Sequence, residues 1–151
     1  MQTKTIQPKK YFCFVGQTTL NTISQDAGAE VDLLFEEAHK MKLEQTGPLE
    51  FVYLDATDDK NKPFTLWIAL PVKSEQPLSN SKYGFKEQGE FKCYTHIHKG
   101  EVTDLYEVYG KIYNDLFGKG MQPTNQIREV YEKFESLVSP ENITEIQIGI
   151  Q

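Results

Sequence analysis

Two halves of this chain follow the same pattern, and that repeat limits the possible folds more than any other feature. Residues 11–71 align with residues 91–151 at a shift of 80 positions at both ends of each half, and at a shift of 78 positions around residues 51–53. Each half ends in a stretch, 66–70 and 146–150, where large aliphatic residues occupy every second position. A period of two is typical of strands that bury one face. We therefore expect two halves with the same architecture.

Each half contains a helix between its first strand and its last two strands. The spacing of apolar residues predicts helices over 29–42 and 103–117, the second with Thr103 as its N-cap. Shorter strands are expected at 49–55 and 127–131. The order in both halves is therefore strand, helix, strand, strand.

One domain of 151 residues is large enough to hold both halves around a core. Their expected limits are about 8–73 and 89–151, and the turn-rich segment 74–88 is expected to link them. A helix that covers one face of an antiparallel sheet leaves the other face available. The expected fold class is α+β, a tandem pseudo-twofold repeat with two helices packed on an antiparallel sheet and a central ligand cleft.

The charge balance argues against direct binding to nucleic acid. The chain has 16 basic and 22 acidic residues, and its formal net charge of −6 repels phosphate backbones. No apolar segment approaches the roughly 20 residues that cross a bilayer, and the N-terminal stretch lacks a signal-peptide core. Cys13 and Cys93 lie in apolar strand patterns, which is typical of reduced cysteines. We expect a cytoplasmic protein without membrane contact.

Strand alternation gathers aromatic side chains around one carboxylate. With Val52 and Val130 directed toward the helices, the neighbouring strand residues share the opposite, open face, and tyrosines of the second helix close the rim. The residues expected to line this cleft are Phe51, Tyr53, Trp67, Tyr109, Tyr113, Glu129, Tyr131 and Gln147.

A carboxylate among aromatic rings suits a delocalised organic cation. Each ring contributes roughly 0.5 to 2 kcal/mol of cation–π attraction, and Glu129 supplies the counter-charge. A neutral guest would leave the buried carboxylate without a partner. Spacing alone leaves open the alternative that Glu129 is exposed to solvent and that Trp67 and the tyrosines complete a core.

The end of the chain carries a family resemblance. Residues 128–131, Arg-Glu-Val-Tyr, precede a polar hairpin, and residues 142–150 form the last alternating strand. This ending resembles that of GyrI-like proteins and of the effector-binding domains of BmrR- and AraC-type regulators, and so do the tandem halves from Tyr11 onward. The family's Glu-x-Tyr element matches Glu129 and Tyr131, and the resemblance implies that Glu129 faces a cationic ligand.

The resemblance implies a module that senses or sequesters an aromatic cation, with a homodimer or a separate regulatory protein as the expected partner. Two alternatives stay open. Some relatives resemble hydrolases that open cyclopropane rings, in which Glu129 and Tyr131 would activate water, and others bind and inhibit proteins. One departure is Gly149, since many members have a proline near this position.

Neither a metal nor a cofactor is indicated by the sequence. His96 and His98 share one expected strand face, but the other histidine, His39, belongs to the first expected helix. The glycines form no phosphate-binding loop, and no nucleophile has an activating partner that the sequence reveals. Catalysis is therefore not predicted.

Overall fold

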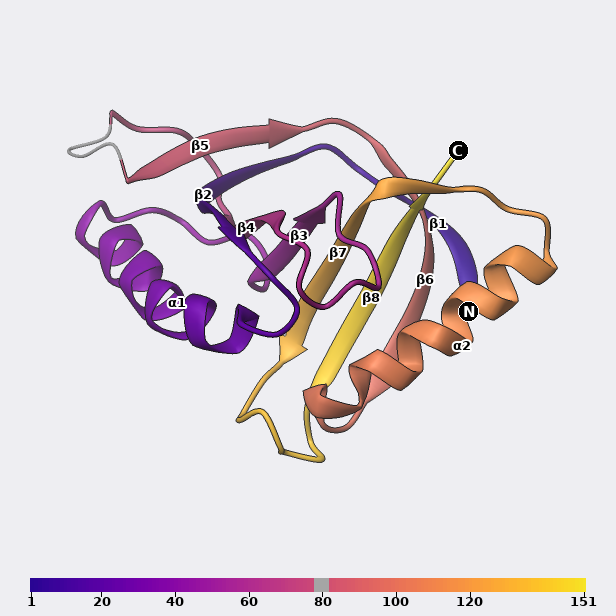
Figure 1. The fold of residues 1–151 in the computed structure, drawn as a ribbon. Coiled ribbons are helices and arrows are strands. Elements are labelled where there is room, and N and C mark those ends of the chain that lie inside the picture. Colours follow the sequence, from indigo (N-terminus) through magenta and orange to yellow (C-terminus); the bar gives the residue numbers. More distant parts are fainter. Residues whose placement is uncertain (78–81) are drawn as a thin grey trace.

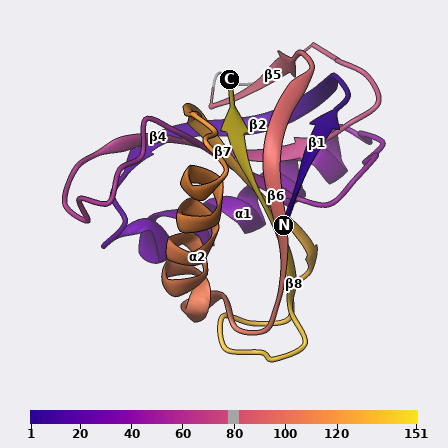
Figure 2. The same cartoon turned by 90° about the vertical axis from the view of Figure 1, so that its right-hand side faces the viewer.

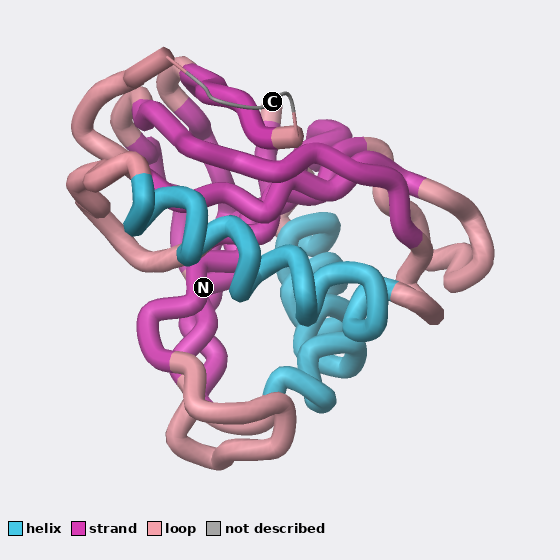
Figure 3. The backbone as a smooth tube through the Cα atoms, turned by 90° about the vertical axis from the view of Figure 1, so that its left-hand side faces the viewer, coloured by secondary structure: helices cyan, strands magenta, loops and turns pink. Residues whose placement is uncertain are grey.

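In the part of the chain that the structure describes, eight strands form one antiparallel sheet, and both helices lie on one of its faces (Figures 1 and 3). The computed structural model describes residues 1–77 and 82–151. The strands are β1 (Gln2–Ile6), β2 (Lys9–Thr18), β3 (Glu50–Leu54), β4 (Phe64–Pro71), β5 (Tyr83–Gln88), β6 (Phe91–Lys99), β7 (Pro123–Lys133) and β8 (Ile143–Ile150). The helices are α1 (Ile23–Lys40) and α2 (Leu105–Gly118), and a 3-10 turn, Val102–Asp104, precedes α2. The α+β class is thus confirmed.

The strand order is β1-β6-β8-β7-β3-β4-β2-β5, and the strands of the two halves occupy matching positions when the order is followed inward from each edge. Strands β2, β4 and β3 come from the first half, and β6, β8 and β7 come from the second in the matching positions. The two edge strands exchange sides, because β1 precedes β2 but pairs with β6, while β5 precedes β6 but pairs with β2. The order is symmetric about the pair of β3 and β7, where the halves meet.

Several elements differ from their expected bounds. Strand β5 occupies the end of the segment that we expected to be a linker, because Tyr83 and Phe85 pack their rings against Phe12 at centroid distances of 5.4 and 5.3 Å. Strand β1 was not expected, since most of its residues are exposed. Thr103 lies inside the 3-10 turn and does not cap the helix. Ser79, Asn80 and Ser81 belong to the turn-rich segment 74–88 that we expected to be a linker, and they lie outside the described residues.

Each helix covers its own half of the sheet with a separate core. The buried set under α1 includes Phe12, Leu34, Leu66 and Ile68, and the set under α2 includes Tyr94, Ile112, Leu116, Ile146 and Ile148. Figure 2 shows α2 lying against the β6–β8 side of the sheet. Among the described residues, no helix has the length and apolar character needed to cross a membrane. The part of the sheet under α1 therefore meets the part under α2 at the central strands β3 and β7.

Gly149 lies on β8 next to a part of β7 where the pairing of the two strands is irregular. The register shifts between Pro123 and Ile127. A Cβ atom on Gly149 would lie 2.9 Å from a ring carbon of Phe91 and 3.0 Å from the backbone oxygen of Gln126. A side chain of any size would therefore force the strands apart.

We predict that Gly149→Ala lowers the free energy of unfolding by about 1–3 kcal/mol, because overpacking displaces backbone that cannot relax. Chemical denaturation followed by circular dichroism measures the change. Gly84→Ala on β5 is the control, since a Cβ there meets nothing within 4 Å. Equal stability of the two variants would contradict the close approach at Gly149.

Candidate functional site

Glu129 lies in the middle of β7 with its carboxylate enclosed by three tyrosine hydroxyls. Only 4% of the residue is exposed. Its Oε1 accepts hydrogen bonds from Tyr53 at 2.8 Å and from Tyr131 at 2.6 Å, and its Oε2 accepts one from Tyr109 at 2.6 Å. The three donors come from β3, β7 and α2. One carboxylate thus joins the two halves of the sheet and the second helix.

The chain positions these groups by strand register and by helix spacing. Glu129 pairs directly with Phe51 on β3, so Tyr53 is a diagonal neighbour on the same face. Tyr131 lies two residues further along β7 and therefore also points to this face. Tyr109 is in the second turn of α2, the helix that covers this part of the sheet.

Glu129 has no basic partner in the part of the chain that the structure describes, because none of the salt bridges involves it. Burial raises the pKa of Tyr53, Tyr109 and Tyr131 well above the ordinary value of 10, and the nearby Glu129 carboxylate raises them further. The phenols are therefore neutral donors at physiological pH. Hydrogen bonds alone compensate the burial of Glu129.

Aromatic rings continue outward from this carboxylate. The Tyr131 ring meets Phe51 edge-on at a centroid distance of 5.1 Å and Phe134 at 6.1 Å. On α2, Tyr113 stacks with Phe117 at 5.9 Å. Phe51, Tyr131 and Tyr113 are half-buried. The surroundings of Glu129 are therefore aromatic. Phe134 also belongs to them, and it was not among the residues predicted to line the site, although it lies three residues beyond Tyr131.

The prediction that Phe51, Tyr53, Glu129 and Tyr131 share one face is confirmed by the strand register, but the face is not the expected one. Glu129 pairs with Ile146, which belongs to the core under α2. These residues therefore lie on the helix side of the sheet. We expected the side away from the helices, and that expectation was wrong.

Trp67 and Gln147 do not join this group. Val52 pairs with Trp67 on one side and with Arg128 on the other, and Arg128 pairs with Gln147. Directly paired residues point to the same face, so all four lie on the face opposite Glu129. Alternation fixes the faces within one strand, whereas the relation between strands depends on register, which alternation does not determine.

The opposite face holds two further buried carboxylates, and both have a lysine partner. Glu50 Oε2 lies 2.7 Å from the Lys9 ammonium, and Glu145 Oε2 lies 3.0 Å from that of Lys4. Burial acts to raise the pKa of Glu145, but its hydrogen bonds hold that pKa below the ordinary value. Glu129 differs from both, since among the described residues only phenols compensate its burial.

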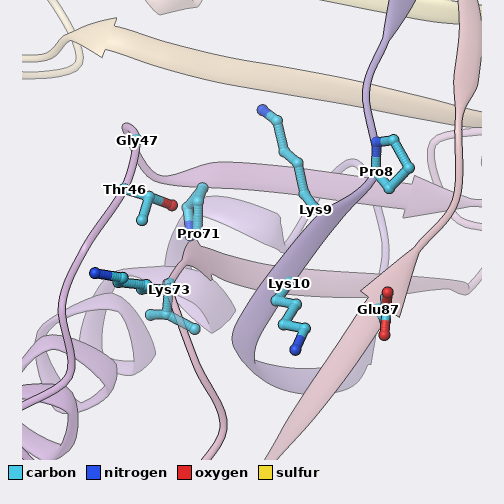
Figure 4. A pocket seen from close by; sticks show the side chains of 9 residues that line it. Pro8, Lys9, Lys10, Thr46, Gly47, Pro71, Lys73 and Glu87 are labelled. Atoms are coloured by element: carbon cyan, nitrogen blue, oxygen red, sulfur yellow. The ribbon is translucent and has the colours of Figure 1, made fainter.

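Two surface cavities lie elsewhere. One of about 430 Å³ includes Lys9, Lys10 and Lys73 in its lining, but their ammonium groups point in different directions (Figure 4). The other, of about 420 Å³, includes His96 and His98 beside α2. Glu129 lines neither cavity, because the tyrosines close over it. A ligand at Glu129 would therefore have to displace phenol hydroxyls.

We predict that the fold loses stability above pH 10. A tyrosine whose pKa is raised by folding stabilises the protein fully below its unfolded pKa of 10, and this contribution is lost as the pH rises toward the folded pKa. The free energy of unfolding should therefore be level through neutral pH and fall above about pH 10. Urea denaturation at a series of pH values measures it.

Glu129→Gln provides the comparison for this titration. It removes the charge that raises the pKa of the three tyrosines but leaves their burial in place, so phenolate absorbance should appear at a lower pH than in the wild type. If the three phenols of the folded wild type titrate at their ordinary value, the enclosed arrangement is contradicted.

Solved structures share this fold at low sequence identity. The C-terminal domain of EcmrR superposes with a TM-score of 0.81 and 20% identity, over 99% of this chain and 96% of that one. EcmrR in complex with DNA gives a TM-score of 0.83 and 19% identity, and this chain spans 56% of its length. SAV2435 bound to tetraphenylphosphonium gives 0.68 and 12%, over 99% of this chain and 93% of that one.

No family model matches the chain, and no curated protein matches it. The solved structures thus extend over the whole chain but stay below the identity at which more than a fold can be inferred. The resemblance to effector-binding domains that the sequence indicated is supported by this shared architecture. The chain has the fold that the EcmrR C-terminal domain and SAV2435 share.

Proposed function

We propose that this protein binds lipophilic aromatic cations at Glu129. The observation that carries the proposal is the contrast among the buried carboxylates: Glu50 and Glu145 each have a lysine, whereas Glu129 has three neutral phenols. A buried carboxylate without a cation attracts positive charge strongly, because the low dielectric around it screens little. A cationic guest supplies the missing charge.

The aromatic surroundings select the kind of cation. A small hydrated ion would exchange its water for poor ligands, since the neighbours of Glu129 are rings and neutral phenols and not further carboxylates or carbonyls. A delocalised organic cation loses less hydration and gains contact with the faces of Phe51 and Tyr131. SAV2435 was solved with such a cation, tetraphenylphosphonium, which therefore serves as the probe.

Binding is better supported than hydrolysis. A hydrolase would need a water molecule on Glu129 to act as its general base. Both carboxylate oxygens already accept hydrogen bonds from tyrosines, and Oε1 accepts two of them. The function that we propose is sensing or sequestration of a ligand, and a partner chain would convert binding into a response.

We predict that tetraphenylphosphonium binds the wild type saturably and that Glu129→Gln weakens binding by about tenfold to a hundredfold, the value of one charge-assisted contact. The variant keeps the size of the side chain and an acceptor for the phenols. Isothermal titration calorimetry measures both dissociation constants.

Two controls distinguish binding that depends on the Glu129 charge from nonspecific hydrophobic binding. Glu145→Gln removes a buried carboxylate of the opposite face and should leave the affinity unchanged. Tetraphenylborate has nearly the same shape with a negative charge and should bind far more weakly than the phosphonium. The proposal fails if Glu129→Gln binds tetraphenylphosphonium as tightly as the wild type does.

A further inference from the structure

The loop between β3 and β4, residues 55–63, reaches from the sheet to the second helix. In Figure 1 it passes in front of β7 and β8 in the direction of α2. Its Lys60 ammonium lies 4.6 Å from the centroid of the Tyr106 ring on α2. Tyr106 is 61% exposed, so the contact forms at the surface. A basic residue of the first half thus rests on an aromatic ring of the second.

Hydrogen bonds hold this loop at both ends. The backbone oxygen of Lys60 accepts a hydrogen bond from Asn21 N–H at 3.2 Å, and the Asn21 side chain donates to Asn61 at 2.6 Å. At the other end, Asp55 N–H donates to the Asn125 backbone oxygen at 2.9 Å, and the Asn125 side chain donates back to Asp55 at 3.0 Å. The loop is therefore anchored beside the start of α1 and on β7.

Tyr106 belongs to the same side of α2 as the tyrosine that binds Glu129. Residues three and seven positions apart share one face of a helix, so Tyr106, Tyr109 and Tyr113 form one stripe. Tyr109, one turn beyond Tyr106, donates its hydroxyl to Glu129. The Lys60 ammonium therefore rests on the ring that begins the stripe leading to the buried carboxylate.

We propose that Lys60 is a built-in competitor for the cation site and sets its selectivity. This inference rests on the function proposed above. The Lys60 ammonium occupies the face of Tyr106, one helical turn before Tyr109, and adds positive charge to this side of α2. A guest must displace Lys60 from this ring or bind despite its repulsion. Guests with several aromatic groups meet this requirement better than compact cations, because their added ring contacts replace the one that Lys60 loses.

The test compares tetraphenylphosphonium binding by wild type, Lys60→Met and Lys62→Met. Methionine keeps much of the length of the lysine stem and removes the charge. Lys62 is exposed in the same loop, and its described hydrogen bond is made by its backbone, so it serves as the matched control. We expect Lys60→Met to tighten binding about two- to fivefold, the fold-change that an exposed cation–π contact corresponds to, and Lys62→Met to change it far less.

A compact cation without rings tests whether Lys60 affects the selectivity of the site. Tetramethylammonium has the same charge and no rings, so it should gain more than tetraphenylphosphonium does from the loss of Lys60. The gain for both cations should shrink as the salt concentration rises, because ions screen the repulsion between Lys60 and the guest.

The outcomes separate this inference from the proposed function. If the wild type binds tetraphenylphosphonium and Lys60→Met binds it no more tightly, or if Lys62→Met tightens binding equally, the role of Lys60 is overturned while the function of Glu129 stands. If neither wild type nor Lys60→Met binds, both proposals fail. Binding by Lys60→Met alone would support Lys60 as a competitor strong enough to keep the wild-type site closed.

Discussion

The burial of one carboxylate against three phenols organises the centre of this protein. Removing Glu129 from water is costly unless its oxygens receive hydrogen bonds. Tyr53 comes from the first half, whereas Tyr109 and Tyr131 come from the second. The hydrogen bonds can form only if β3 pairs with β7 in the observed register and α2 lies on this face. The same contacts that compensate a buried charge therefore also fix how the halves meet.

Buried carboxylates on the two faces of the sheet are compensated by different groups. On the face without helices, lysines from strands β1 and β2 neutralise Glu145 and Glu50. On the helix face, neutral hydroxyls solvate Glu129 without neutralising it. Paired charges have little to gain from a further cation, whereas an unpaired one does. This difference in compensation, more than burial itself, directs the functional interpretation to the boundary between the two helices.

Much of the architecture could be predicted from the sequence, because it repeats. The aliphatic period of two at 66–70 and 146–150 and the helical spacing around Leu34 and Ile112 led to the α+β class and to both helices. Strand β1 escaped prediction because an exposed strand at the sheet edge has no apolar face to reveal it.

The candidate site could be predicted only in part, for a physical reason. Tyr53, Glu129 and Tyr131 were grouped correctly because alternation within a strand fixes relative faces. Trp67 was grouped with them wrongly, because its face relative to theirs depends on its pairing with Val52, which a one-residue shift in register would reverse. The Lys60 contact involves two surface residues far apart in sequence, and no local pattern signals it.

A crystal structure with a bound cation would show directly whether the cation lies at Glu129. Tetraphenylarsonium has the shape and charge of the phosphonium and carries an arsenic atom whose anomalous scattering marks its position in a crystal. We predict one strong arsenic peak on the helix side of β7, with the cation's phenyl rings in contact with Tyr131 and the Glu129 carboxylate. A peak beside Trp67 on the opposite face, or no ordered peak at saturating ligand, would contradict this prediction.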